Sequence, residues 1–295
     1  MAQHRAPWIA HSIRRAADEI LGAADVALEG LTSETPSRAV HDFRVALKRW
    51  RALLRLLSGQ LGEAVALRRE AGLLSRTFNR SRDAQAALDA LADMAGTKDA
   101  TAPSVWGRNR AAIVTRVEGL RRTSEMAALD AKTLQRLRAG LARASASLSR
   151  WPLKRMAFED LATALARSYR RARRRLPRNW ETASAEDIHA FRKAVVTFRY
   201  QLELFEPLWP KASRTLTGEM QKLRVRLGKS NDLVALGALI RPRQPLARWR
   251  SGLALPIESR RQFHLIRARR LARRLFAETP RSFRKRIEAK VEAKS

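Results

Sequence analysis

Val40-His41-Asp42-Phe43-Arg44 and Ile188-His189-Ala190-Phe191-Arg192 are two closely similar segments of this sequence, and each opens a long helical pattern. Each is followed by a second segment, and these two segments also match each other. The first is Asn79-Arg80-Ser81-Arg82-Asp83, and the second is Gly228-Lys229-Ser230-Asn231-Asp232. The spacing is 42 residues from His41 to Asp83 and 43 residues from His189 to Asp232. A repeat of this length is typical of one helical unit used twice.

Helical periodicity dominates the rest of the chain, and no run shows the alternation that is typical of strands. Proline and glycine turn signals separate the helical runs. The expected helices span residues 7–30, 36–58, 62–79, 82–95, 104–122, 130–149, 153–175, 185–206, 211–228, 231–240, 256–277 and 280–292. Because long helices joined by short loops favour antiparallel bundles, the sequence predicts an all-α protein. The repeat divides it into a first unit, 1–150, and a second unit, 151–295.

The charge balance points to a polyanionic partner. The chain has 60 Lys and Arg residues against 28 Asp and Glu residues, which gives a formal net charge of +32. Internal pairing cannot neutralise this excess, so we expect binding to nucleic acid, polyphosphate or an anionic membrane surface. The absence of cysteine excludes disulfides and thiolate metal sites and fits a reducing cytoplasm. No signal peptide and no transmembrane helix are expected, because the chain shows no apolar leader and no long apolar run.

The expected helix 36–58 carries a basic stripe and an apolar stripe on opposite faces. The basic stripe, at helical spacing, comprises His41, Arg44, Lys48, Arg51 and Arg55. The apolar stripe comprises Phe43, Leu47, Trp50, Leu54 and Leu57. The apolar stripe is expected to pack into a bundle. A solvated helix face would usually interleave acids four residues from its cations, so a basic stripe without acids favours a phosphate-binding face.

The second copy keeps this plan with fewer cations. His189, Arg192 and Arg199 match the first basic stripe, and Lys193 is an added cation. The stripe is interrupted by Val196, Thr197 and Glu203. The matching apolar stripe comprises Phe191, Val195, Phe198, Leu202 and Phe205. The first half is therefore expected to be the stronger binder. The other histidines, His4, His11 and His264, do not precede an arginine on a basic stripe and are interpreted as incidental.

Four polar residues are assigned structural roles. Ser184 with Asp187 three residues later resembles a capping box at the start of the expected helix 185–206. Asp83 and Asp232 are poor ligands for phosphate, because like charges repel. We interpret these two carboxylates as helix N-caps or as braces for a nearby Arg or His.

The doubled motif resembles the CHAD family, the conserved-histidine α-helical domain, over roughly residues 5–290. The motifs that carry the resemblance are His41-x-x-Arg44-x-x-x-Lys48-Arg49-x-Arg51 with Arg82-Asp83, and His189-x-x-Arg192, Arg199-Tyr200-x-x-Glu203, Leu227-Gly228 and Asn231-Asp232. The resemblance implies two four-helix bundles related by pseudo-two-fold symmetry, with a basic groove or pore between them. It further implies binding of inorganic polyphosphate, frequently at polyphosphate granules. The chain departs from the family at Val196 and Thr197, where basic residues are usual.

By the same resemblance, cations at further helix ends join the candidate site. The predicted polyphosphate-binding residues are His41, Arg44, Lys48, Arg49, Arg51, Arg55, Arg76, Arg80, Arg82, His189, Arg192, Lys193, Arg199, Tyr200, Lys222, Arg226 and Lys229. No cofactor and no metal are predicted.

The sequence favours a binding protein over an enzyme. Gly228-Lys229-Ser230 looks like the end of a P-loop, but the motif also needs a glycine at the position of Leu223. No metal-ligand spacing and no nucleophile motif is present. Two alternatives stay open: nonspecific nucleic-acid binding, against which the aromatic content of 6% argues, and an adaptor that recruits enzymes to polyphosphate. The expected location is the cytoplasm, on polyphosphate granules.

Overall fold

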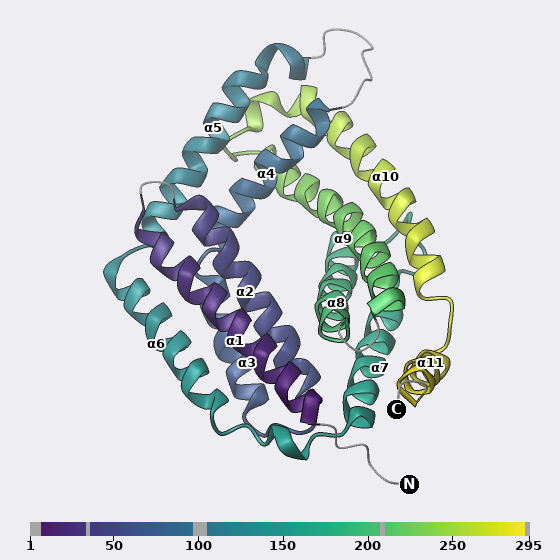
Figure 1. Cartoon of the computed structure of the whole chain (residues 1–295). Coiled ribbons are helices and arrows are strands. Elements are labelled where there is room, and N and C mark those ends of the chain that lie inside the picture. Colours follow the sequence, from purple (N-terminus) through teal and green to yellow (C-terminus); the bar gives the residue numbers. More distant parts are fainter. Residues whose placement is uncertain (1–6, 34–35, 97–104, 207–209, 293–295) are drawn as a thin grey trace.

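The computed structural model describes residues 7–33, 36–96, 105–206 and 210–292, and within these ranges the regular structure is entirely helical (Figure 1). The predicted all-α fold is confirmed. The long helices are α1 (Pro7–Glu29), α2 (Ser37–Leu56), α3 (Ala64–Arg76), α4 (Asn79–Ala95), α5 (Val105–Ala128), α6 (Ala131–Leu148), α7 (Phe158–Arg174), α8 (Ala185–Leu204), α9 (Pro210–Leu239), α10 (Arg250–Leu275) and α11 (Pro280–Glu292). Three short 3-10 turns, Gly30–Thr32, Leu153–Arg155 and Ala247–Trp249, join some of them.

The two apolar stripes are buried as the helical spacing predicts. In the first stripe, Phe43, Leu54 and Leu57, the last just beyond α2, are completely buried, and Leu47 and Trp50 are nearly so. In the second stripe, Phe191, Val195 and Leu202 are completely buried, and Phe198 and Phe205 are nearly so. Burying a large apolar side chain contributes about 1.5–3 kcal/mol, so these stripes fix which face of each helix is left for the cations.

Some helix boundaries differ from the prediction. The expected helices 211–228 and 231–240 form one continuous helix, α9, because a single glycine at 228 does not break a helix whose flanking residues are buried. Helix α10 starts before its Pro256, which lies inside the helix. The N-cap assignment of Asp83 and Asp232 is wrong, because both lie within helices. The cap at Ser184 is confirmed, since its hydroxyl oxygen accepts a hydrogen bond from the backbone N–H of Asp187 at 3.0 Å.

The buried apolar side chains form two clusters, and each draws on both sequence repeats. The larger cluster joins α1, α2, α3 and α6 to α7, α8 and α11, together with the first part of α9 and the last part of α10. The smaller cluster lies between α4, α5, the end of α9 and the start of α10. The repeats therefore share their cores. The division at residues 150–152 and the pseudo-two-fold relation of two bundles stay predictions from the sequence.

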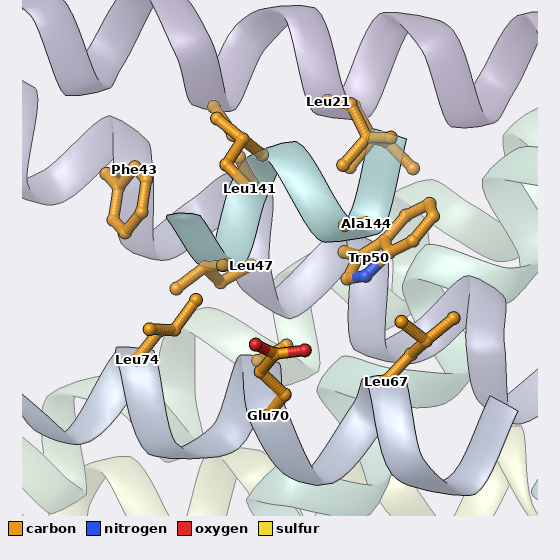
Figure 2. A pocket seen from close by; sticks show the side chains of 14 residues that line it. Leu21, Phe43, Leu47, Trp50, Leu67, Glu70, Leu74, Leu141 and Ala144 are labelled. Atoms are coloured by element: carbon orange, nitrogen blue, oxygen red, sulfur yellow. The ribbon is translucent and has the colours of Figure 1, made fainter. Parts of the chain in front are cut away.

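An apolar pocket lies between α1, α2, α3 and α6. Figure 2 shows Leu21, Leu67 and Leu141 around it, with the carboxylate of Glu70 at its edge. That carboxylate accepts hydrogen bonds from Nε of Arg143 at 2.9 Å and from its Nη2 at 2.5 Å. Since its walls are otherwise hydrocarbon, this pocket does not suit an anion, and the cations must be sought elsewhere. No described helix combines the length and the apolar character needed to cross a membrane.

Candidate anion-binding site

Five cations from four helices meet where the two repeats face each other. We call them the central cluster: Arg44 and Lys48 on α2, Arg82 on α4, Arg192 on α8 and Arg224 on α9. They are brought together because α2 packs against α8, α8 against α9, and α9 against α4 (Figure 1). Each sequence half thus contributes part of the cluster.

Burial and mutual repulsion perturb these groups strongly. Loss of hydration, followed by the charges of Arg44, Arg192, Arg82 and Arg224, lowers the pKa of Lys48 to about 7. Burial and the charge of Arg82 lower the pKa of Arg44 to about 10. The pKa of Arg192 is likewise lowered, mainly by burial. Bringing five cations together out of water costs free energy that a bound anion would offset.

The central cluster has few internal partners. Within the described part of the chain, Arg44, Lys48 and Arg192 form no ion pair within 4.0 Å, and the buried Nε atoms of Arg44 and Arg192 have no hydrogen-bond acceptor. The guanidinium of Arg82 lies 3.8 Å from the exposed Asp83, and Arg224 donates to the neutral side chain of Gln221 at 2.8 Å. Donors of this kind are available to an external anion.

Two carboxylates flank the cluster without pairing tightly with it. The charge of Asp83 raises the pKa of Arg44, and the charge of Asp232 raises that of Arg192. Burial raises the pKa of Asp232 to about 6 in spite of Arg192. The bracing role stays a prediction from the sequence, whereas the alternative capping role is wrong because both residues lie inside helices.

The two motif histidines differ in their surroundings. His41 is exposed, whereas His189 is half-buried with its Nδ1 2.7 Å from Oδ1 of Asn231. Burial and the charge of Lys193 lower the pKa of His189, although the contact with Asn231 opposes the shift. With Nδ1–H donating to Asn231, the neutral ring presents Nε2 as an acceptor. His189 can therefore donate to a phosphate oxygen from Nε2 only when the ring is protonated.

Several predicted residues lie in other groups around the cluster. Arg51 lies close to Gly72 on α3. Burial lowers the pKa of Arg51, and the charges of Arg68 and Arg76 lower it further. Arg49 and Tyr200 line a separate pocket between α1 and α8. The guanidinium of Arg199 pairs with Glu203 at 2.5 Å and stacks over the ring of Tyr200, 4.4 Å from its centroid. Arg55 is partly buried on α2, and Arg80 is exposed on α4.

The predicted cations on α9 have acid partners or aromatic neighbours of their own. Lys222 pairs with Glu219 at 2.7 Å, and the ammonium of Lys229 pairs with Asp93 on α4. Arg226 lies 3.4 Å from Nδ1 of His264 and 5.9 Å from the ring of Phe263. The contacts of Lys229 and Arg226 hold α9 against α4 and α10, whereas the pair of Lys222 lies within α9.

A second polar group, the Asp93 cluster, was not found from the sequence. The carboxylate of Asp93 accepts hydrogen bonds from Arg260 at 2.7 and 3.0 Å, from Nε2 of His264 at 2.7 Å, and from Lys229. The side chain of His264 is completely buried. The interpretation of His264 as incidental is therefore wrong. Arg224 was also missed, since it has no counterpart in the His-x-x-Arg motif.

Comparison with known proteins identifies the fold family. The family model described as "CHAD domain" matches residues 12–241. The chain belongs to the CHAD family. A crystal structure of the CHAD domain from the plant Ricinus communis is similar to this CHAD domain with a TM-score of 0.60 and 20% sequence identity, and the match covers 95% of this chain and 92% of that chain. A search of curated proteins gives no match. Helices α10 and α11 lie beyond residue 241, outside the family match.

Proposed function

We propose that this CHAD domain binds inorganic polyphosphate at the central cluster without cleaving it. CHAD domains are linked to polyphosphate binding in general, and the net charge of +32 calls for a polyanionic partner. The observation that carries the proposal is the set of unpaired cations, Arg44, Lys48 and Arg192, which come from both repeats and are partly buried. Guanidinium groups pair bidentately with phosphate oxygens, and their charge persists at any physiological pH.

The arrangement suits a chain of phosphates better than a single phosphate. The cations of α2 continue beyond Arg44 and Lys48 to Arg51, next to Arg68 and Arg76 on α3. A flexible chain with a charge on every unit can contact the central cluster and this extension at once. Binding of this kind releases counterions, so its affinity falls steeply as salt is raised.

Binding without chemistry is the simplest use of this site. The central cluster supplies positive charge and hydrogen-bond donors, and its members are poor nucleophiles when protonated. Nucleic acid is a weaker candidate. Single-strand binders use exposed aromatic platforms, and the large exposed apolar side chains among the described residues are all aliphatic or methionine. We also place the protein in the cytoplasm, at polyphosphate granules, as part of the proposal.

The proposal is tested by isothermal titration calorimetry with long-chain polyphosphate, duplex DNA and heparin at physiological salt. We expect polyphosphate to bind most tightly, and Arg44→Gln with Arg192→Gln to weaken it more than tenfold. Hydrogen bonds to charged groups contribute about 1.5–3 kcal/mol each, which sets this scale. Arg69→Gln with Arg138→Gln, two exposed arginines on α3 and α6, is the matched control. Equal affinity for all three polyanions, or equal losses in both double variants, would reject the proposal.

A further inference from the structure

A second group of cations lies near the ends of three helices that carry no member of the central cluster. We call it the end patch: Arg170 and Arg174 on α7, Arg270 and Arg273 on α10, and Arg281 and Lys285 on α11. All six side chains are exposed. Within the described residues, none of these six side chains forms a hydrogen bond or an ion pair. The end patch is thus a surface of free positive charge.

Buried contacts hold the three helix ends together. The ring of Tyr169 on α7 stacks on Phe283 of α11, with centroids 4.4 Å apart and planes 4° apart. The hydroxyl of Tyr169 donates to the carbonyl oxygens of Leu275 at 3.3 Å and Glu278 at 3.1 Å, which lie at the end of α10 and just beyond it. Arg173 donates from Nε to the carbonyl oxygen of Phe276 at 3.1 Å. The end patch therefore sits on a fixed support.

The end patch and the central cluster lie on different helices. Helix α8 packs against α2, which carries part of the central cluster, and against α7, and α7 in turn packs against α11. Figure 1 shows α11 and the end of α10 at the outer edge of the molecule, away from α2 and α4. A ligand in the central cluster leaves the end patch open.

Local stabilisation does not account for this many charges. A helix C-terminus carries the equivalent of about half a negative charge, which favours one nearby cation. The last two turns of α7 hold Arg170, Arg171, Arg173 and Arg174, with no acid among them. Acids close to the patch already have partners, since Glu278 pairs with Arg286 and Glu288 with Arg284. The surplus charge is left for a ligand.

We propose that the end patch is a second binding surface for polyphosphate, so that one protein molecule bridges two phosphate chains or two segments of one chain. This inference rests on the proposed function of the central cluster. The end patch is exposed and hydrated, so its contacts are weaker and more sensitive to salt than those of the partly buried cluster. The role of the end patch is to bind a second chain, or a second segment, once the central cluster holds the first. Proteins and phosphate chains then form a network.

The end patch suits a bare phosphate chain better than a single-stranded nucleic acid. The aromatic rings beside it, Tyr169, Phe276 and Phe283, are all buried and thus unable to stack on bases. The cations lie near the ends of three helices that Tyr169 and Arg173 link, and a flexible anion with closely spaced charges can adapt to their positions. Bridging also supplies a physical route by which a small protein gathers polyphosphate into larger bodies.

The test compares two sixfold glutamine variants of the full chain. The patch variant is R170Q/R174Q/R270Q/R273Q/R281Q/K285Q. The control variant, R69Q/R116Q/R122Q/K132Q/R138Q/R155Q, removes the same charges from exposed positions elsewhere. Light scattering follows the titration of each protein with polyphosphate several hundred units long, and calorimetry measures the affinity for tripolyphosphate. A protein with one site decorates a long chain without linking it, whereas a protein with two sites forms a network.

We expect wild type and control to scatter strongly with the long chain, and the patch variant to scatter at least tenfold less. All three should bind tripolyphosphate with affinities within about threefold of one another. Equal scattering by patch and control variants would overturn the bridging inference while leaving the central site intact. Scattering that depends on the patch with duplex DNA, but not with polyphosphate, would reassign the patch to nucleic acid. If wild type bound neither form of polyphosphate, the proposed function itself would fail.

Discussion

The central cluster and the Asp93 cluster contain similar cations and differ in whether a buried acid lies within ion-pair distance of them. In the Asp93 cluster, one carboxylate with only 5% of its side chain exposed is shared by Lys229, Arg260 and His264. In the central cluster, Arg44, Lys48 and Arg192 have no such acid within ion-pair distance. A group whose charges are satisfied within the protein holds helices together. A group whose charges are not satisfied is available to a ligand.

The protonation of the two clusters reflects the same difference. Burial alone would raise the pKa of Asp93, but hydrogen bonds from Arg260, Lys229 and His264 together hold it well below its ordinary value. In the central cluster, burial and like charge act in the same direction and lower the pKa of Lys48 to about 7. The first cluster is stabilised by its own charges, whereas the like charges of the second destabilise the unliganded protein.

Removal of the shared acid should have the largest effect. Asp93→Ala leaves Lys229, Arg260 and His264 without their anion in a buried setting. Breaking a buried charge network by removing one partner costs about 3–5 kcal/mol, and the partial exposure of Lys229 favours the lower end of that range. Urea denaturation followed by circular dichroism measures the loss. Asp42→Ala removes an exposed partner of Arg38 and serves as the control, with an expected change below about 1 kcal/mol.

Acid titration of the wild-type protein examines the same group. Since the pKa of Asp93 is lowered on folding, its stabilising contribution is present above its ordinary pKa of about 4 and declines as the pH falls below that value. The Asp93→Ala protein should lose less stability than wild type below this pH. Identical stability of wild type and variant at neutral pH would mean that the Asp93 cluster does not hold α4 against α9 and α10.

The sequence predicted one of these two clusters far better than the other. The central cluster follows from a local pattern, since Arg44, Lys48 and Arg192 are set by helical spacing within α2 and α8. The Asp93 cluster joins residues that are 136 to 171 positions apart, and neither Asp93 nor His264 belongs to the repeat. Its members are recognisable only once α4, α9 and α10 are packed together. Helical spacing shows which residues share a face, but the tertiary fold decides which faces meet.

A moderate effect is expected from the protonation of Lys48. A bound phosphate chain favours charged Lys48, so binding above pH 7 takes up a proton, and affinity for long-chain polyphosphate should fall about tenfold from pH 6 to pH 9. The arginines near Lys48 stay charged throughout this pH range. The pKa of His189 is lowered by burial, which shifts its titration away from the upper part of the range. Calorimetry in two buffers with different heats of ionisation measures the proton uptake.

Lys48→Arg is the decisive comparison for this pH dependence. An arginine keeps the charge at this position at pH 9, so the fall in affinity and the proton uptake above pH 7 should both disappear. Without ligand, the lowered pKa of Lys48 means that the unfolded chain binds more protons above pH 7. The free wild-type protein should therefore gain stability as the pH rises from 7 toward 10. A pH dependence of binding shared by wild type and Lys48→Arg would assign it to another group.

The smallest effect is expected at Gly228, where the second repeat approaches the central cluster. No described glycine has a positive φ, and a Cβ at Gly228 would lie 3.8 Å from Nε and Nη2 of Arg192, an ordinary van der Waals contact. Gly228→Ala should therefore stabilise α9 by up to about 1 kcal/mol through helix propensity and change polyphosphate affinity less than twofold. Gly140→Ala is the opposite case, because its Cβ would lie 2.7 Å from Cδ1 of Leu74 and should lower the melting temperature. A loss of affinity in Gly228→Ala would show that Arg192 must move toward the glycine when an anion binds, and that the unliganded cluster is not yet in its binding geometry.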